Sequence, residues 1–277
     1  MAKTIVISGG TDGMGRAFSL ARAALGDTVI ALGSDPAKGE ALARAARVHF
    51  LPADLSVVSE NERVIAEIET AHDTVDALLL FANRVSARRV TTIDGFERTF
   101  ALYYLSRYLL SHRLTPLLRR AERPVIVNIG GVGVRKGAID WTDPQLADGY
   151  SAVRAQLQAG RANDLLGVAY AESGGVPYVL YHPGFTRSGD LSQLKPLVRW
   201  MIRGLARLSA QPVAAAIEPL HAFVDYSSTA PLRAVDRGRD LELSLPTLDP
   251  GDAHRLADLT ANLLRPTGPR PAPDASR

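Results

Sequence analysis

Short apolar runs alternate with longer amphipathic stretches along most of the chain. The apolar runs are rich in Val, Ile and Leu and carry almost no charge, as parallel strands do when both of their faces are buried. They predict six strands, at 4–8, 28–32, 48–51, 77–81, 125–129 and 178–181. The stretches between them predict helices near 14–25, 36–46, 57–71, 95–119 and 151–172. This alternation predicts the α/β fold class, with a doubly wound parallel sheet and helices on both of its faces.

The pattern changes after Pro183-Gly184. Within 194–208, apolar residues recur at helical spacing while basic residues recur every four positions, at Lys195, Arg199, Arg203 and Arg207. We expect an amphipathic helix that covers a substrate cleft within 186–210, with a plain surface helix or a membrane-surface helix as alternatives. Two more helices are predicted at 212–224 and 252–264. The tail 266–277 holds four prolines and no apolar pattern, which predicts a disordered end to one domain spanning 1–265.

Composition narrows the classes of function. Apolar residues make up 46% of the chain and charged residues 22%, as in ordinary globular proteins. The absence of cysteine excludes disulfides, thiolate metal sites and a cysteine nucleophile, and the six scattered histidines predict no metal site. The net charge of +3 is spread along the chain, so we expect no nucleic-acid partner. With neither a signal-peptide pattern nor an apolar run long enough for a membrane span, the sequence predicts a cytoplasmic protein.

A glycine-rich loop follows the first predicted strand and leads directly into a helix. Glycines permit a tight turn and a close backbone approach to a pyrophosphate, which the N–H groups at the helix N-terminus then bind. A strand, glycine loop and helix in this order predict a dinucleotide site on a Rossmann-type sheet. The expected cofactor-binding residues of the loop are Gly9, Thr11, Asp12, Gly13, Met14 and Gly15.

The spacing of Gly9, Gly13 and Gly15 resembles the short-chain dehydrogenase/reductase family. Asp54-Leu55 resembles the family's Asp-Leu pair at the adenine, and 94–106 resembles its fourth helix. The segment 182–188 resembles the part that closes on the nicotinamide, which adds Pro183, Gly184 and Ser188 to the expected cofactor-binding residues. The resemblance covers roughly 3–190 and is closest to the retinol-dehydrogenase-like branch. It implies NAD or NADP as cofactor, a small-molecule substrate and a homo-oligomer formed through the fourth and fifth helices.

The end of the second strand bears on the choice between NAD and NADP. A carboxylate there would bind the ribose 2′-hydroxyl of NAD, whereas a basic group would pair with the 2′-phosphate of NADP. Ser34 occupies this place and can bind either ribose, Asp35 follows it, and Lys38 lies one turn further on. Asp12 would repel a 2′-phosphate, but Arg16 and Lys38 would attract one. We therefore favour NADP.

The family's catalytic side chains are not found at their usual positions. Relatives use an Asn, a Ser, a Tyr and a Lys four residues after the Tyr, because an acid beside the carbonyl must shield the developing alkoxide. The Asn position falls on Tyr103 and the Ser position on Gly131. The Tyr and Lys positions fall on Gln156 and Gly160, or, with a shift of one residue, on Leu157 and Arg161.

Other residues are candidates for the missing acid. Tyr150 and Arg154 have the spacing of the Tyr-Lys pair and share a helical face, although Arg stays protonated and cannot relay a proton as Lys can. Tyr103 is a candidate donor to a substrate oxygen. The expected catalytic residues are Tyr150, Arg154 and Tyr103, and packing within the helices is the alternative role for each.

Three functions fit these observations. The first is an NAD(P)-dependent oxidoreductase with an atypical active site that acts on a carbonyl or alcohol of a hydrophobic small molecule. The second is a non-redox enzyme of secondary metabolism, a cyclase, isomerase or dehydratase, on the same scaffold. The third is a non-catalytic dinucleotide sensor.

Overall fold

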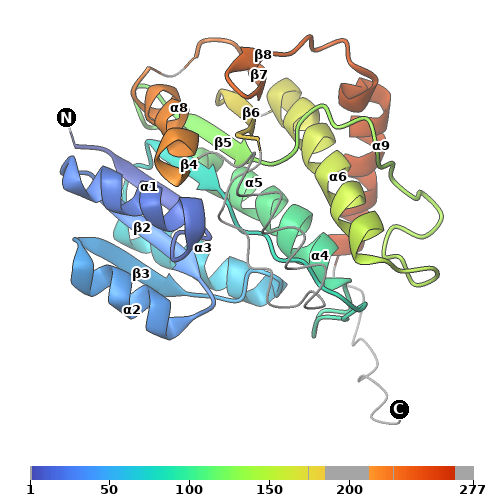
Figure 1. The fold of residues 1–277 in the computed structure, drawn as a ribbon, viewed down its shortest axis with the longest axis horizontal. Helices are drawn as coiled ribbons and strands as arrows, with labels where there is room; N and C mark the ends of the chain where they lie inside the picture. The colour runs from blue at the N-terminus through green and yellow to red at the C-terminus, as the bar shows by residue number, and fades with distance from the viewer. Residues whose placement is uncertain (1, 174, 185–211, 227, 266–277) are drawn as a thin grey trace.

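One twisted sheet organises the part of the chain that the computed structural model describes, which comprises residues 2–173, 175–184, 212–226 and 228–265. Eight strands are found within these residues, in the order β3-β2-β1-β4-β5-β6-β7-β8 (Figure 1). Neighbouring strands are parallel, except that β8 runs antiparallel to β7. The strands are β1 (Thr4–Ser8), β2 (Thr28–Gly33), β3 (Val48–Pro52), β4 (Ala77–Leu80), β5 (Val125–Ile129), β6 (Tyr178–His182), β7 (Leu232–Asp236) and β8 (Arg239–Asp240).

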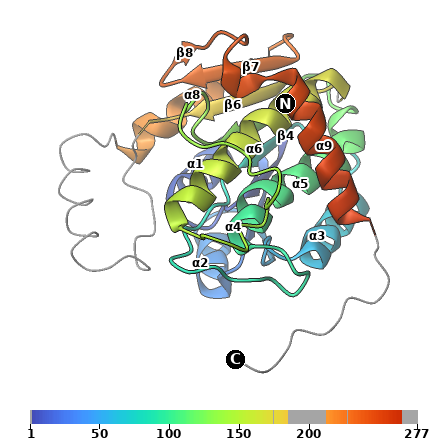
Figure 2. The same ribbon diagram turned by 90° about the vertical axis from the view of Figure 1, so that its right-hand side faces the viewer.

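Helices cover both faces of the sheet, as predicted (Figures 1 and 2). The side chains of each strand alternate between two apolar cores, so that Ile5 and Ile7 pack with α1, α2 and α8 while Val6 faces the helices opposite. The helices are α1 (Gly13–Ala24), α2 (Pro36–Ala45), α3 (Val58–Ala71), α4 (Arg98–Phe100), α5 (Ser106–Leu118), α6 (Ala152–Ser173), α8 (Val213–Asp225) and α9 (Pro250–Leu264), with a 3₁₀ turn η2 at Pro246–Leu248. The α/β doubly wound fold is therefore confirmed.

The prediction of only six strands was wrong. After Pro183-Gly184 the alternation continues, because α8 is followed by β7, which pairs in parallel with β6. Arg233 interrupts the apolar run of β7 and Asp236 ends it, and this obscured its strand pattern. The predicted basic helix at 194–208 and the tail 266–277 lie outside the described residues.

The predicted helix 95–119 begins later and is divided. Glu97 accepts hydrogen bonds from the backbone N–H groups of Thr99 and Phe100, at 2.8 and 2.7 Å, and so caps α4. A π-helical turn, η1 (Ala101–Leu105), then separates α4 from α5. Such turns often occur at functional sites, and this one carries Tyr103.

Helix α9 lies along α6 on the outside of the helical layer (Figure 2). The hydroxyls of Tyr104 and Thr260 are 2.6 Å apart in a buried contact, and the Arg255 guanidinium stacks 4.2 Å from the ring centroid of Trp141. α9 therefore covers part of the helical face through which self-association was expected. A homo-oligomer stays a prediction, and one built on that part of the face would first have to displace α9.

No helix within the described residues combines the length and the apolar character that crossing a membrane requires.

Candidate functional site

The glycine loop between β1 and α1 is folded tightly enough to exclude side chains. Gly9 adopts a φ of +70°, and a Cβ atom there would lie 2.8 Å from the backbone nitrogen of Ala82. A Cβ atom on Gly15 would lie 2.2 Å from the carbonyl oxygen of Gly9. Because both obstacles are backbone atoms, only glycine fits at these positions. Asp12 completes the loop by accepting a 2.8 Å hydrogen bond from the Gly13 N–H at the start of α1.

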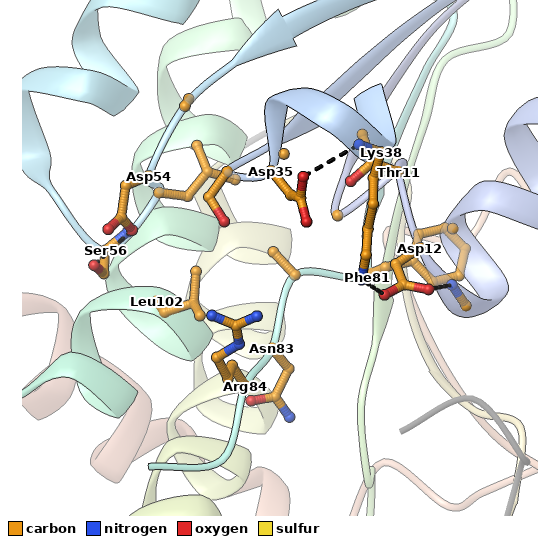
Figure 3. A pocket seen from close by; sticks show the side chains of 18 of the residues that line it. Thr11, Asp12, Asp35, Lys38, Asp54, Ser56, Phe81, Asn83, Arg84 and Leu102 are labelled. Carbon is orange, nitrogen blue, oxygen red and sulfur yellow. Dashed lines mark hydrogen bonds and ion pairs between the residues drawn. The ribbon is translucent and has the colours of Figure 1, made fainter. Parts of the chain in front are cut away.

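A pocket opens beside this loop at the carboxyl ends of β1 to β4 (Figure 3). The glycine loop supplies one wall, and the segments after β2 and β3 supply another. Nine of the predicted cofactor residues meet here: Gly9, Thr11, Asp12, Gly13, Met14, Gly15, Ser34, Asp54 and Leu55. Pro183 and Gly184 follow β6 and are not among the residues that line this pocket, and Ser188 lies outside the described residues.

The far wall contains two residues that sequence reasoning missed, Arg98 and Leu102. Both belong to the α4–η1 region, and their separation of four residues, which places them on one helical face, was the available signal. Arg84 follows β4, and its guanidinium extends into the pocket beside Leu102 (Figure 3). The chain thus places a basic side chain in the pocket after β4.

Charged groups gather where β2 ends. Asp35 caps α2 by accepting a 3.1 Å hydrogen bond from the backbone N–H of Lys38. The ammonium of Lys38 reaches back across the pocket and pairs with the Asp12 carboxylate (Figure 3). Asp54 turns toward Ser56 and accepts from its N–H at 3.0 Å and its hydroxyl at 2.7 Å. The basic group closest to the end of β2 is therefore already engaged by an acid of the glycine loop.

The α6 positions assigned to the family's Tyr and Lys bear no acid or base. Gln156 exchanges amide hydrogen bonds with Asn83, at 3.0 and 3.1 Å, and donates to the Arg84 carbonyl at 3.2 Å. A Cβ atom on Gly160 would meet no atom within 4 Å. This face of α6 has open space where a longer side chain would fit.

Two buried polar side chains, Tyr103 and Arg107, contact each other in the helical layer next to α6. The Arg107 guanidinium is fully buried and lies 4.6 Å from the ring centroid of Tyr103. It donates to the Asn128 side-chain oxygen, to the Ile129 carbonyl at 2.7 Å and to the Ala82 carbonyl at 3.1 Å. Burial lowers the pKa of Arg107 to about 10, so the side chain remains a cation at neutral pH. This cation ties the ends of β4 and β5 to α5.

Substitution of Arg107 by alanine should destabilise the fold strongly. It would leave three buried acceptors without their donor, and we expect the free energy of unfolding to fall by about 3–5 kcal/mol. Arg63→Ala is the matched control, because Arg63 pairs with Glu60 and Glu67 at the surface and should lose less than about 1 kcal/mol. Urea unfolding of both variants measures the difference. Equal losses would contradict a structural role for Arg107.

The Tyr103 hydroxyl lies at the carboxyl end of β5. A Cβ atom on Gly130 would come within 3.1 Å of the hydroxyl oxygen, so a glycine here makes room for the phenol. Burial raises the pKa of Tyr103, while Arg107 and the Gly131 backbone act against this rise. The hydroxyl therefore stays protonated at neutral pH. Tyr103 is buried, and it is not among the residues that line the pocket beside the glycine loop.

Tyr150 and Arg154 lie apart from Tyr103. The Tyr150 hydroxyl donates to the Ser86 carbonyl at 2.8 Å, and burial raises its pKa. The Arg154 guanidinium pairs with Asp140 at 2.5 Å. Neither residue lines the pocket beside the glycine loop. Their catalytic role stays a prediction. The contacts described here hold Tyr150 just before α6 and Arg154 in the first turn of that helix.

No cluster of three or more metal-ligating side chains occurs in the part of the chain that the structure describes.

Comparison with known proteins decides the family. The family model described as short chain dehydrogenase matches residues 3–143, which hold the glycine loop and the first five strands. The chain belongs to the short-chain dehydrogenase family. In a solved short-chain dehydrogenase from Streptomyces avermitilis, the fold recurs with a TM-score of 0.63 at 21% identity, over 95% of this chain and 94% of that one. The assignment of Gln156 and Gly160 to the family's Tyr and Lys positions stays a prediction.

Curated relatives agree with this family. Polyprenol dehydrogenase of Mus musculus is 27% identical over 57% of this chain, and retinol dehydrogenase 13 of Homo sapiens is 28% identical over 51%. These matches span 50% and 45% of the two relatives, about half of their length. The short-chain dehydrogenase relationship supports a general oxidoreductase function.

Proposed function

We propose that this short-chain dehydrogenase is an NAD(P)-dependent oxidoreductase that acts on a carbonyl or alcohol of a hydrophobic small molecule, with an atypical active site. The observation that carries the proposal is the glycine loop, whose backbone leaves no room for a Cβ atom on Gly9 or Gly15 beside a pocket lined by Asp54 and Leu55. A pyrophosphate fits such a cradle, because the loop leads into the N-terminus of α1. Two relatives are named for lipophilic alcohols, which supports a hydrophobic substrate.

Each pocket wall has a part in this proposal. The loop from Gly9 to Gly15 would hold the pyrophosphate, Ser34 the adenosine ribose, and Asp54 with Leu55 the adenine. Pro183, Gly184 and Ser188 would contact the nicotinamide end. When bound, the dinucleotide supplies or accepts the hydride, and the chain must place a proton donor beside the substrate oxygen.

Tyr103 is the donor that the geometry favours. Its hydroxyl reaches the end of β5, where the absence of a side chain on Gly130 makes room for it. Tyr150 and Arg154 would first have to leave Ser86 and Asp140. We therefore assign proton donation to Tyr103 and keep Tyr150 with Arg154 as the alternative pair.

Assays of cofactor turnover test the function. The oxidoreductase should change the nicotinamide absorbance in step with the reduction of lipophilic ketones or aldehydes. A non-redox enzyme is the second candidate, favoured by the open space at Gly160 and the amide at Gln156. It would give a product equal in mass to its substrate, or lighter by one water, without cofactor turnover. Such a product would overturn the oxidoreductase proposal in favour of a non-redox enzyme.

Lys38 should set the preference for NADP. A 2′-phosphate near Ser34 would compete with Asp12 for the Lys38 ammonium. We expect Lys38→Ala to weaken NADPH binding about tenfold, equivalent to about 1.4 kcal/mol, and to leave NADH binding nearly unchanged. Calorimetric titration of both cofactors provides the measurement, with Lys136→Ala as a control outside the pocket. An equal loss for both cofactors would contradict recognition of the 2′-phosphate.

A further inference from the structure

One acidic side chain lies on α6 next to the proposed proton donor and has no assigned role. Asp164 is only 3% exposed, and its carboxylate accepts a 3.1 Å hydrogen bond from the Gly133 N–H. It follows Gln156 and Gly160 at intervals of four residues, which places the three on neighbouring turns of one helical side. Gln156 and Gly160 carry no ionisable group, so Asp164 is the first ionisable residue after them on that side of α6.

The same turn after β5 receives both Asp164 and Tyr103. The phenol approaches it at Gly130 and Gly131, and the carboxylate approaches it at Gly133. The two side chains interact electrostatically, since the Asp164 charge raises the pKa of Tyr103. A phenol and a carboxyl group from two different helices thus approach the same glycine-rich turn.

A structural role alone explains the position of Asp164 poorly. Burial disfavours a carboxylate that forms no ion pair within the described residues, and an amide would accept the Gly133 hydrogen bond equally well. The nearby Arg161 guanidinium donates to the Val134 carbonyl at 3.0 Å. A buried ionisable group with a strongly shifted pKa is more typical of a functional site than of a cap.

We propose that Asp164 is a positioning residue that exchanges protons with Tyr103, so that the phenol can act as the acid of the reaction; this rests on the proposed oxidoreductase function. During reduction the carbonyl carbon gains the hydride that the dinucleotide supplies, and the π electrons of the C=O bond move to oxygen. That oxygen takes the Tyr103 proton. The phenolate then takes the proton of the Asp164 carboxyl, and water restores it. In alcohol oxidation every transfer runs in reverse.

The protonation of Asp164 matches this role. Burial raises its pKa to about 7, against the opposing effects of the Gly133 N–H and Arg161. Within the described residues, the charged group that acts on Asp164 is Arg161 on its own helix, and the titratable group on which Asp164 acts is Tyr103 on η1. Leu241 and Leu245, which approach the turn at Gly133, carry no charge. Near neutral pH the carboxyl can therefore give or accept a proton.

A pH profile of the reduction tests the role. The acid form of Asp164 is needed, so kcat/KM of wild type should fall as pH rises above about 7. Asp164→Asn keeps an acceptor for the Gly133 N–H but cannot titrate, and we expect kcat/KM about 10²-fold lower at pH 6 and no fall across pH 7. Asp143→Asn is the matched control: Asp143 also accepts backbone N–H groups, but it lies outside the site and should keep the wild-type profile.

A second measurement needs no cofactor. Carbon-13 NMR of the aspartate carboxyl groups should show one resonance that titrates near pH 7 and is missing from Asp164→Asn. Titration of this resonance in the ordinary Asp range, or a fall across pH 7 that persists in Asp164→Asn, would overturn the inference. The calorimetric titration tests the proposed function separately. If the wild-type protein binds no dinucleotide there, the proposed function fails.

Discussion

Gly15→Ala should abolish dinucleotide binding. The new methyl group would lie 2.2 Å from the Gly9 carbonyl oxygen and 2.9 Å from the Gly9 carbonyl carbon, far inside van der Waals contact. Because these are backbone atoms, the loop itself must open, and its N–H groups then no longer converge on one anion. We expect affinity to fall at least 100-fold, about 2.7 kcal/mol, by calorimetric titration of NADPH and NADH.

Gly251→Ala is the control for this substitution. Its Cβ atom would approach only the Asp249 side chain, at 3.2 Å, in the first turn of α9 and far from the pocket along the chain. Dinucleotide affinity should stay at the wild-type value. If Gly15→Ala folds and binds dinucleotide as wild type does, the loop is not the pyrophosphate site.

Tyr103→Phe should lower the rate of carbonyl reduction on the order of 10³-fold. The substitution removes only the hydroxyl at the end of β5, and the ring can keep its stacking contact with the Arg107 guanidinium. The fold should therefore persist, and the loss should appear in kcat more than in KM. Steady-state kinetics with the best carbonyl substrate separates the two constants.

Two other tyrosines make this prediction specific. Tyr108→Phe changes a ring that packs on His112 further along the same helix, and it should leave the kinetics unchanged. Tyr150→Phe tests the alternative pair, since the Tyr150 hydroxyl is engaged by the Ser86 carbonyl. A large loss in Tyr150→Phe with wild-type rates in Tyr103→Phe would reverse the assignment.

The parts of the site that depend on local sequence were predictable. The glycine loop is encoded within a few residues, because backbone clearance at Gly9 and Gly15 excludes other residues. The Asp54-Leu55 pair follows a recognisable strand, and the structure places both beside the loop. In each case strand, turn and helix signals were adjacent in the sequence.

The parts that depend on tertiary packing were not predictable. Tyr150 and Arg154 have a suggestive spacing, but the Ser86 carbonyl and Asp140 that engage them come from loops folded against α6. The role inferred for Asp164 depends on the turn after β5, which no pattern on α6 reveals. The strand β7 was not predicted because Arg233 interrupts its short apolar run and Asp236 ends it.

The position of the Tyr103 hydroxyl also depends on tertiary structure, so it could not be predicted from the sequence. A phenol on η1 can reach the end of β5 because glycine at position 130 clears a path for it. A π-helical turn and a glycine segment are separated along the chain, and only the folded sheet brings them together.

Calorimetric titration of the wild-type chain with NAD, NADH, NADP and NADPH tests the central claim most directly. A pocket built on the glycine loop predicts saturable heat with at least one of the four, accompanied by a rise in melting temperature, because a ligand bound only by the folded state stabilises it. Absence of both heat and thermal stabilisation with all four dinucleotides would contradict the account.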